Sequence, residues 1–355
     1  MFAARTCGGQ PYDQLNWKLI GPSFWNSYKN SMEATIAVAS VPDTTSFTGG
    51  GVNADANSVG GILYYRSGVY YVFCIPNGST ADRIYNSSTN TFISINTSGY
   101  DSFGYTGGVL LKNGKIYMVP NVGGTARIFD PGSGVTTPSG SFPTSKNFKA
   151  VLLPNGNVYC IPGNFSAGES ARIYNPAANT LTTVSGTFTI GCNNGILMAD
   201  GRVFCATVSG SAIIFNPTTN TLSNANVTMS PGSKAELLPD ERVLIISDSA
   251  IKIYYPDLDV AVTSSVTISG VSHFTLIQNG KILILTSSGL RLYDPIFDTI
   301  STSSQTGVGS FMNLLPNGKV LMTVGGTGGS TASKLYGGGV SFNENVLLSS
   351  YYNSI

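Results

Sequence analysis

The chain has 355 residues, of which 10% are charged, and its formal net charge is +1. This length suits two ordinary domains or one large repeat-built domain, and the low charge leaves no basic face for phosphate contacts, so a nucleic-acid partner is not expected. Gly is abundant at 42 residues and long runs of helix formers are missing, which predicts an all-β chain with polar loops.

Residues 1–58 differ in pattern from the rest of the chain. The segment "MFAARTCGGQPYDQ" lacks the apolar centre of a signal peptide, and no apolar run reaches the roughly 20 residues of a membrane helix, so neither export by a signal nor membrane insertion is expected. Both tryptophans follow in "YDQLNWKLIGPSFWNSYKNSM". Closely spaced aromatic residues often anchor interfaces, which makes this arm a candidate for docking on a partner or for packing on the rest of the chain; the four candidate anchors are Trp17, Phe24, Trp25 and Tyr28.

From residue 59 onward one phrase recurs seven times, as an apolar run, a turn and a second apolar run. Asn-Gly or Asp-Gly between apolar runs is a strong hairpin signal, and we expect a type I′ turn with positive φ at both central residues. The second turn residue recurs at intervals of 38 to 46 residues, at Gly68, Gly114, Gly156, Gly201, Glu241, Gly280 and Gly318.

A second phrase follows each copy of the first, as in "ARIFDPGSGVT" and "ARIYNPAANTL". Asp or Asn before Pro starts a turn, and another strand follows it. Each repeat therefore contains two hairpins, or four strands, which is the size of a propeller blade. The sequence predicts a seven-bladed β-propeller of four-stranded antiparallel blades over 59–342, with blades that begin near 59, 107, 149, 194, 234, 273 and 312.

The two phrases resemble those of kelch-type propellers related to the galactose oxidase family, which also alternate an Asn-Gly or Asp-Gly turn with an aromatic-Asp-Pro turn. The resemblance covers roughly residues 59–342 and concerns the fold. The diglycine of that family survives only at Gly325-Gly326, and its Trp after the second turn is replaced by Phe92, Leu181 or Leu222. Residues 34–41 read as a strand that would close the ring beside the last blade, and 343–355 read as a last strand or tail.

Two aligned columns have structural explanations. Cys74, Met118, Cys160, Cys205 and their equivalents share one strand position, which predicts buried apolar thiols. A basic residue occupies another column in six of seven copies, two residues before an aromatic residue of the same strand. We interpret it as packing between blades, with the charged head on loop carbonyls.

A third column supplies the candidate ligand site. Lys149, Lys234 and His273 occupy equivalent positions where the first strand of a blade begins, and they would form a positive arc at one mouth of the channel. The alternative is solvated charge on the rim. Aromatic residues between repeats are further candidates as glycan platforms, or else pack between blades: Tyr100, Phe103, Tyr105 and Phe165.

The residue types argue against several activities. The chain has a single histidine, which is incompatible with the two copper-binding histidines of galactose oxidase and with most triads, so no catalytic, metal or cofactor site is predicted. Many of its acids lie in turns and show no pairing typical of glycosidases. We therefore expect a non-enzymatic structural or attachment protein of a larger assembly, such as a virion or phage appendage that presents its propeller to a host glycan or receptor. The alternatives are a secreted or surface carbohydrate-binding module in an extracellular setting, and a carbohydrate-active enzyme.

Overall fold

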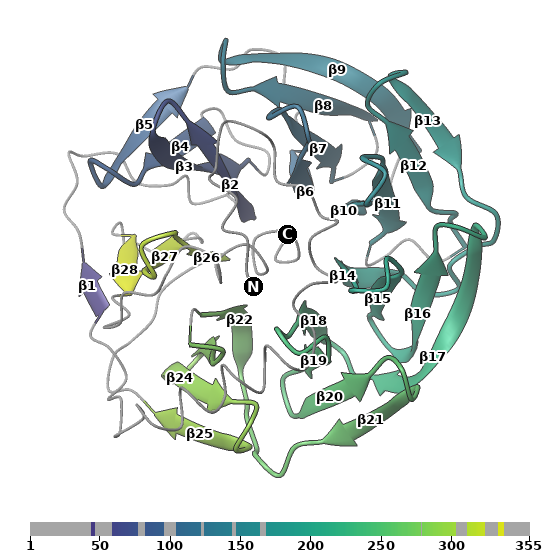
Figure 1. Ribbon diagram of the computed structural model, residues 1–355, viewed down its shortest axis with the longest axis vertical. Helices are drawn as coiled ribbons and strands as arrows, with labels where there is room; N and C mark the ends of the chain where they lie inside the picture. Colours follow the sequence, from purple (N-terminus) through teal and green to yellow (C-terminus); the bar gives the residue numbers. More distant parts are fainter. Residues whose placement is uncertain are drawn as a thin grey trace, which may run out of the picture.

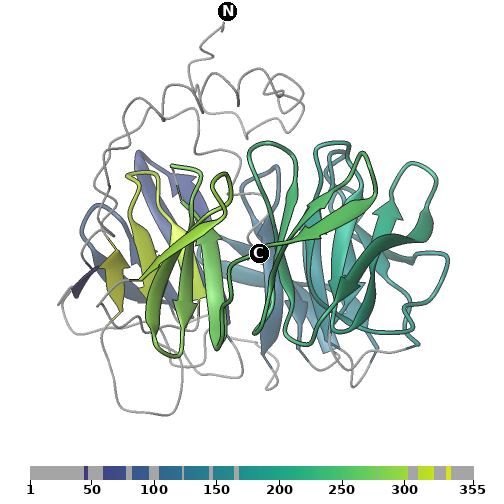
Figure 2. The ribbon, with the colours of Figure 1, turned by 90° about the horizontal axis from the view of Figure 1, so that it is seen from below.

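A computed structural model describes residues 44–46, 59–76, 82–95, 104–121, 124–143, 147–163, 168–277, 279–302, 311–323 and 333–336. These residues form seven antiparallel sheets of four strands each, arranged in a ring around a central axis (Figure 1). Seen edge-on, the strands span the thickness of a disc (Figure 2). The seven-bladed propeller predicted from the repeat is confirmed, and no helix is present among the residues that the structure describes.

The first four blades follow each other along the chain, each running from the inner to the outer strand. Blade 1 consists of β2 (Gly60–Arg66), β3 (Val69–Ile75), β4 (Asp82–Asn86) and β5 (Thr91–Ile95). Blade 2 consists of β6 (Tyr105–Leu110), β7 (Ile116–Pro120), β8 (Gly124–Asp130) and β9 (Val135–Phe142). Blade 3 consists of β10 (Phe148–Leu152), β11 (Val158–Pro162), β12 (Arg172–Asn175) and β13 (Thr180–Thr183). Blade 4 consists of β14 (Cys192–Leu197), β15 (Val203–Thr207), β16 (Gly210–Asn216) and β17 (Thr221–Met229).

The last three blades keep this order, except that the outer strand of blade 7 comes from the start of the chain. Blade 5 consists of β18 (Lys234–Leu237), β19 (Val243–Ile246), β20 (Ile251–Tyr255) and β21 (Val260–Thr263). Blade 6 consists of β22 (Val271–Leu276), β23 (Ile282–Thr286), β24 (Gly289–Asp294) and β25 (Thr299–Thr302). Blade 7 consists of β26 (Phe311–Leu314), β27 (Val320–Thr323), β28 (Lys334–Tyr336) and β1 (Thr44–Ser46).

Ring closure is carried by β1, which pairs antiparallel with β28 from Thr44 opposite Tyr336 to Ser46 opposite Lys334. The sequence places a closing strand at 34–41, which lies outside the described residues. The segment 1–58 therefore contributes at least residues 44–46 to the propeller itself.

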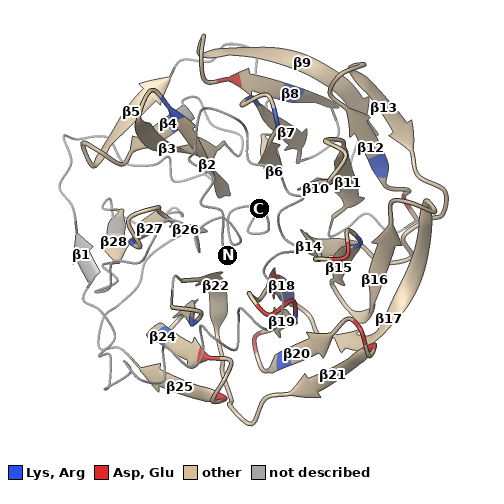
Figure 3. Cartoon of the chain, viewed as in Figure 1, with Lys and Arg blue, Asp and Glu red and all other residues tan. Residues whose placement is uncertain are grey.

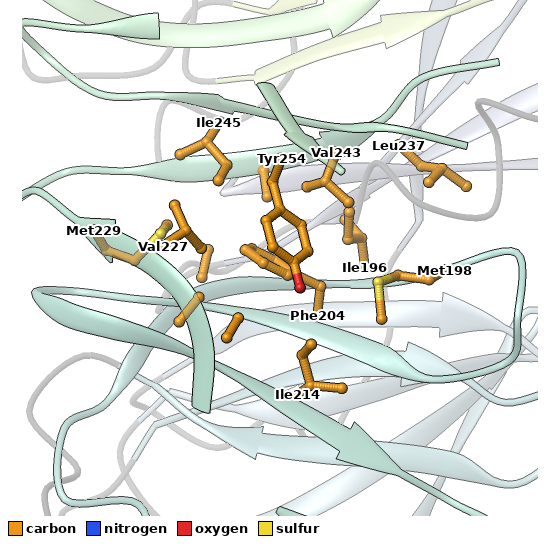
Figure 4. Packing of buried hydrophobic residues seen from close by; sticks show 14 residues of the cluster. Ile196, Met198, Phe204, Ile214, Val227, Met229, Leu237, Val243, Ile245 and Tyr254 are labelled. Carbon is orange, nitrogen blue, oxygen red and sulfur yellow. The ribbon is translucent and has the colours of Figure 1, made fainter. Parts of the chain in front are cut away.

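The core consists of apolar layers between neighbouring blades. Ile196 and Phe204 of blade 4 pack with Leu237, Val243 and Tyr254 of blade 5 (Figure 4). Stacked rings cross three other interfaces, with ring centroids 4.6 Å apart for Phe73 and Phe129, 4.2 Å for Tyr117 and Tyr174, and 4.0 Å for Tyr159 and Phe215. Each blade thus buries both faces of its sheet.

The thiols lie in these layers. Cys74, Cys160, Cys192 and Cys205 are buried, as the aligned column predicts for three of them. The basic column lies on the third strands, away from the axis. Arg83 donates to Ser94 Oγ at 2.7 Å, and Lys252 Nζ donates to the carbonyl of Thr228 at 2.7 Å, so these heads bind the outer parts of the blades.

The hairpin turns differ from the expected type I′. In blade 2 the amide of Gly114 donates to the carbonyl of Leu111 at 2.9 Å, and the amide of Leu111 donates to Lys115. Gly114 has a φ of 79°, whereas the φ of Asn113 is not positive. This is a type I turn followed by a left-handed residue, the three-residue hairpin loop. Only the Ser67-Gly68 turn of blade 1 has two positive φ values, 50° and 83°.

Candidate functional site

The inner strands carry three rows of equivalent residues around the central axis. We define the mouth row as the inner-strand residues that pair with the second-strand position directly after the column of Cys74, Met118 and Cys160: Gly60, Gly107, Lys149, Asn194, Lys234, His273 and Phe311. Lys149, Lys234 and His273 are therefore structurally equivalent, as the alignment places them. Asn194 continues the polar stretch, which spans four consecutive blades, from blade 3 to blade 6. Charged residues are otherwise scattered over the ring, many of them on outer strands and turns (Figure 3).

Each lysine of the mouth row reaches the backbone of a neighbouring blade. Lys149 Nζ donates to the carbonyl of Thr106 at 3.1 Å, and Lys234 Nζ donates to the carbonyl of Ser272 at 2.8 Å. Thr106 and Ser272 are the extra residues where the register shifts in β6 and β22. A β-bulge leaves its extra residue without a ladder partner, so the lysines satisfy carbonyls that the inner hairpins leave free.

Asparagines hold the wall between the two lysines. Asn194 donates from Nδ2 to the carbonyl of Ala235 at 2.8 Å and accepts the amide of Ala235 on Oδ1 at 3.0 Å. Asn193, the bulge residue of β14, donates from Nδ2 to the carbonyl of Ser233 at 2.9 Å. These bonds connect β14 to β18. The side-chain amide of Asn194 therefore has backbone groups as its hydrogen-bond partners.

Charge at the mouth is carried by the two lysines. Burial lowers the pKa of Lys149 to about 8, with a further lowering by the charge of Lys234. Burial also lowers the pKa of Lys234, and the carboxylate of Asp248 opposes that change. His273 has a pKa of about 3 because of its burial and the nearby charge of Lys234, so its imidazole is neutral at physiological pH. The positive arc expected from three residues is therefore a pair of ammonium groups beside a neutral histidine.

The second row, which we call the buried row, lies two residues further along each inner strand: Ile62, Val109, Val151, Ile196, Glu236, Thr275 and Asn313. It is apolar in blades 1 to 4 and polar in blades 5 to 7. Glu236 is 3% exposed, its Oε1 has no hydrogen-bond partner, and desolvation raises its pKa to about 8. Asn313 donates from Nδ2 to the carbonyl of Gly61 at 2.9 Å.

Between these two rows lies the approach row, which faces the preceding blade: Gly61, Gly108, Ala150, Gly195, Ala235, Phe274 and Met312. Small residues let neighbouring inner strands pack closely: a Cβ on Gly195 would lie 2.2 Å from Ile161 Cδ1. Phe274 and Met312 are the large residues of this row, in blades 6 and 7. The strands β18 and β22 approach each other less closely than the other neighbouring inner strands. The face of β18 that carries Lys234 and Glu236 looks toward this wider spacing.

Asn194, Glu236 and Phe274 were not singled out from the sequence as site residues. The signal for each is a departure from its row: an amide among glycines and cations, a carboxylic acid among Ile and Val, and a large ring among Gly and Ala. Recognising these departures requires the strand register, which three bulges interrupt.

Other predicted candidates lie elsewhere. Tyr105 is fully buried, so it is no glycan platform and the packing alternative holds. Tyr100, Phe103 and Phe165 are outside the described residues, as are the four arm residues Trp17, Phe24, Trp25 and Tyr28. In the described part of the chain no group of three or more His, Cys, Asp and Glu side chains is placed to hold a metal ion. Nor does that part contain a helix of the length and hydropathy that crossing a membrane requires.

Comparison with known proteins supports the fold and nothing narrower. No family model and no curated protein matches the chain. Solved propellers match it over most of its length. A fungal alcohol oxidase of the AA5 family, in complex with copper, is 14% identical with a TM-score of 0.65, over 84% of this chain and 76% of the oxidase. Virginiamycin B lyase from Staphylococcus aureus is 8% identical with a TM-score of 0.64, over 83% of this chain and 98% of the lyase.

A larger protein contains a similar ring. The extracellular domain of a protein assigned as a one component system from B. thetaiotaomicron is 13% identical with a TM-score of 0.62. The match covers 84% of this chain but 40% of that domain, so this chain spans well under half of it. At such identities the likeness shows a seven-bladed β-propeller like those of the oxidase and the lyase, and no shared activity.

Proposed function

We propose that this protein is a non-enzymatic attachment component of a larger assembly, and that it contacts its ligand at the channel mouth formed by the starts of the inner strands. The observation that carries the proposal is the mouth row. Four consecutive blades replace Gly and Phe by Lys149, Asn194, Lys234 and His273, although burying amines and an imidazole is costly. Blades 1, 2 and 7 show that the fold does not need polar residues there.

A host-surface glycan is the ligand class that we infer for this mouth. The ammonium groups retain donors beyond their bonds to Thr106 and Ser272, and glycans are dense in hydrogen-bond acceptors. The virion or phage setting is supported by composition, with 10% charged residues and abundant Gly, and by the aromatic arm at residues 17–28 as a docking element. A secreted carbohydrate-binding module would use the same mouth and differ in location. The paired turns also support a kelch-type origin of the repeat.

A glycan array tests the binding half of the proposal. The full-length protein and a Lys149→Gln, Lys234→Gln, His273→Gln triple variant would be applied to neutral and acidic glycans. We expect the wild type to bind a defined subset and the variant to lose that binding while it keeps its melting temperature. A wild type that binds no glycan, or a variant that binds the same subset equally well, would contradict the proposal.

The assembly half needs a separate measurement. Particles released by cells that produce the protein would be labelled with a gold-conjugated antibody and imaged by electron microscopy. Label on the particle surface or appendage supports the attachment role. Label found only in the free protein fraction favours the secreted module.

A further inference from the structure

The outer strand of blade 5 has an exposed apolar surface. Val260 and Val262 of β21 are 41% and 55% exposed. They pair with Tyr255 and Ile253 of β20, which pack in the apolar layer between blades 5 and 6. Directly opposite residues of a ladder lie on the same face of the sheet, so the two valines extend this layer to the rim of the ring.

Two turns beside β21 add large apolar side chains. Leu258, in the turn that leads into β21, is 70% exposed, and Phe297, in the corresponding turn of blade 6, is 53% exposed. The amide of Ser265, two residues after β21, donates to Asp298 at 2.8 Å, so the turn that carries Phe297 lies against the end of β21. We call these four side chains the rim patch: Leu258, Val260, Val262 and Phe297.

Other blades show that the fold does not require the rim patch. At the positions of Val260 and Val262, the outer strands of blades 3, 4 and 6 have Thr or Ser. Blades 1 and 2 have one apolar residue each at these positions, Ile93 and Val135. Exposed apolar residues that gather in one place are typical of interaction surfaces, so the rim patch is a candidate docking surface.

The backbone of β21 also offers hydrogen bonds. Among the residues that the structure describes, β21 is the outermost strand of its sheet and pairs only with β20 (Figure 1). An extended segment can add to such an edge as a further strand, and its alternate side chains would then lie beside Val260 and Val262. The other outer strands have an edge of this kind without the rim patch.

Three carboxylates border the rim patch. Asp257 and Asp259 flank Leu258, and Asp298 follows Phe297. Within the described part of the chain, none of these three forms an ion pair with Lys or Arg within 4 Å. Charge complementarity therefore favours an occupant that carries a cation and no acid.

One segment of the chain itself has this chemistry. Residues 15–19, "LNWKL", alternate apolar and polar side chains as a half-buried strand does, carry one cation and no acid, and precede a Gly21-Pro22 turn signal. They lie outside the described residues. The 24 residues from 20 to 43 connect them to β1 in blade 7 and can span up to about 80 Å when extended, and blade 6 alone separates blade 7 from blade 5 (Figure 1).

We propose that residues 15–19 add to the edge of β21 in the same chain, as a fifth strand of blade 5. Leu15, Trp17 and Leu19 then pack on the rim patch, and Lys18 brings a cation to its carboxylates. A segment tethered to the ring has an effective concentration in the millimolar range, which favours the arm of the same chain over that of a second copy. The proposal does not depend on the attachment role, and the rest of the arm stays available to a partner: Phe24, Trp25 and Tyr28.

Tryptophan fluorescence of the full-length protein tests the proposal. Both tryptophans of the chain lie in the arm, so Trp25→Phe leaves Trp17 as the only one. In this background Trp17 should emit at a shorter wavelength than in the urea-unfolded protein, and acrylamide should quench it less. Adding Val260→Thr and Val262→Thr should shift the emission to longer wavelength and increase the quenching. The ring should still fold, because blades 3, 4 and 6 have Thr or Ser at these positions.

Two matched controls accompany this pair of substitutions. Ile93→Thr with Val135→Thr removes the equivalent apolar residues of blades 1 and 2 and should leave the Trp17 emission unchanged. Lys18→Glu should shift the emission to longer wavelength, because it places an acid among the carboxylates. Lys29→Glu changes the arm outside residues 15–19 and should have no effect.

Several results would overturn the proposal. Trp17 emission equal to that of the unfolded protein would show that the segment is not docked. Emission that the two β21 substitutions leave unchanged, or that the blade 1 and 2 control shifts equally, would show that the rim patch does not hold Trp17. Emission that moves to shorter wavelength as the protein concentration rises would assign the rim patch to the arm of a second copy.

Discussion

At the scale of single residues, the hairpin turns show what the repeat pattern determines and what it leaves open. The second residue of the turn is Gly in six of seven copies, and the structure gives the reason, because that residue takes a left-handed conformation. Blade 5 has Glu241 there, with a φ of 70°. A side chain in this region costs about 1–2 kcal/mol relative to Gly.

Glu241→Gly should therefore raise the free energy of unfolding by about 1 kcal/mol. Urea denaturation of the full-length protein measures the gain. Glu241→Ala is the matched control, because it removes the carboxylate near Asp240 but keeps the Cβ. If Ala stabilises as much as Gly, charge repulsion is the cause and backbone strain is not.

Glu236 is a buried acid whose value to the fold depends on pH. Its pKa is about 8 in the folded protein against an ordinary 4.5, so the folded state holds the proton more tightly than the unfolded state. The contribution of the protonated Glu236 side chain to the free energy of unfolding is complete below pH 4.5 and is lost as the pH rises toward 8.

Glu236→Gln should remove this loss and stabilise the protein at pH 8 by about 1–3 kcal/mol. Melting temperatures between pH 5 and pH 9 test the prediction. Asp257→Asn, which removes an exposed turn carboxylate, should leave the pH dependence unchanged. A Glu236→Gln variant less stable than the wild type at pH 8 would show that the ionised carboxylate has a partner that stabilises it.

At the scale of elements, the second turn of each blade forms a latch that the sequence predicts only in part. The Asn or Asp that starts the turn was predicted, and Asn175 Oδ1 indeed accepts the amide of Ala177 at 3.0 Å. The residue that ends the turn was not predicted to matter. Tyr174 donates its hydroxyl to Asn179 at 3.0 Å, and Tyr293 donates to Asp298 at 2.9 Å.

The same end residue also binds the preceding blade. Ser139 of blade 2 donates to Asn179 of blade 3 at 2.7 Å, and the amide of Ser265, after blade 5, donates to Asp298 of blade 6 at 2.8 Å. These contacts join residues 40 and 33 positions apart, which the pattern within one repeat cannot reveal. They fix the rotation of one blade against the next.

Asp298→Ala should cost about 1–3 kcal/mol of stability, because Ser264, Ser265 and Tyr293 lose their acceptor. Desolvation opposes the shift, but these hydrogen bonds outweigh it and hold the pKa of Asp298 at about 2, below the ordinary 3.8. The contribution is present above pH 4 and is lost as the pH falls toward 2. Thermal unfolding from pH 2 to pH 7 should show the two proteins converging at the acid end, and a constant difference would contradict the latch.

At the scale of the whole molecule, the repeat predicted the number of blades and the number of strands in each blade. Closure was harder to place, because three residues, Thr44–Ser46, complete blade 7 without any strong strand pattern. The two lysines of the mouth row could be predicted, because a charged residue stands out in an aligned column. Phe274 and Glu236 could not, because their role depends on the spacing between β18 and β22, which belong to different blades.

A chain that begins at residue 59 should melt about 5 °C or more below one that begins at residue 44. The shorter chain lacks β1 and exposes the edge of β28, where Leu335 and Tyr336 are buried. Differential scanning calorimetry measures the difference, with the full-length protein as reference. Equal melting temperatures would mean that β1 adds nothing to closure.

The central claim is that the mouth row binds a glycan, and the most direct test is a crystal structure of the full-length protein soaked with a glycan that the wild type binds on the array. The account predicts density for that glycan against Lys149, Lys234 and His273, and its absence in the Lys149→Gln, Lys234→Gln, His273→Gln variant. Density confined to the opposite mouth or to the outer strands would contradict it.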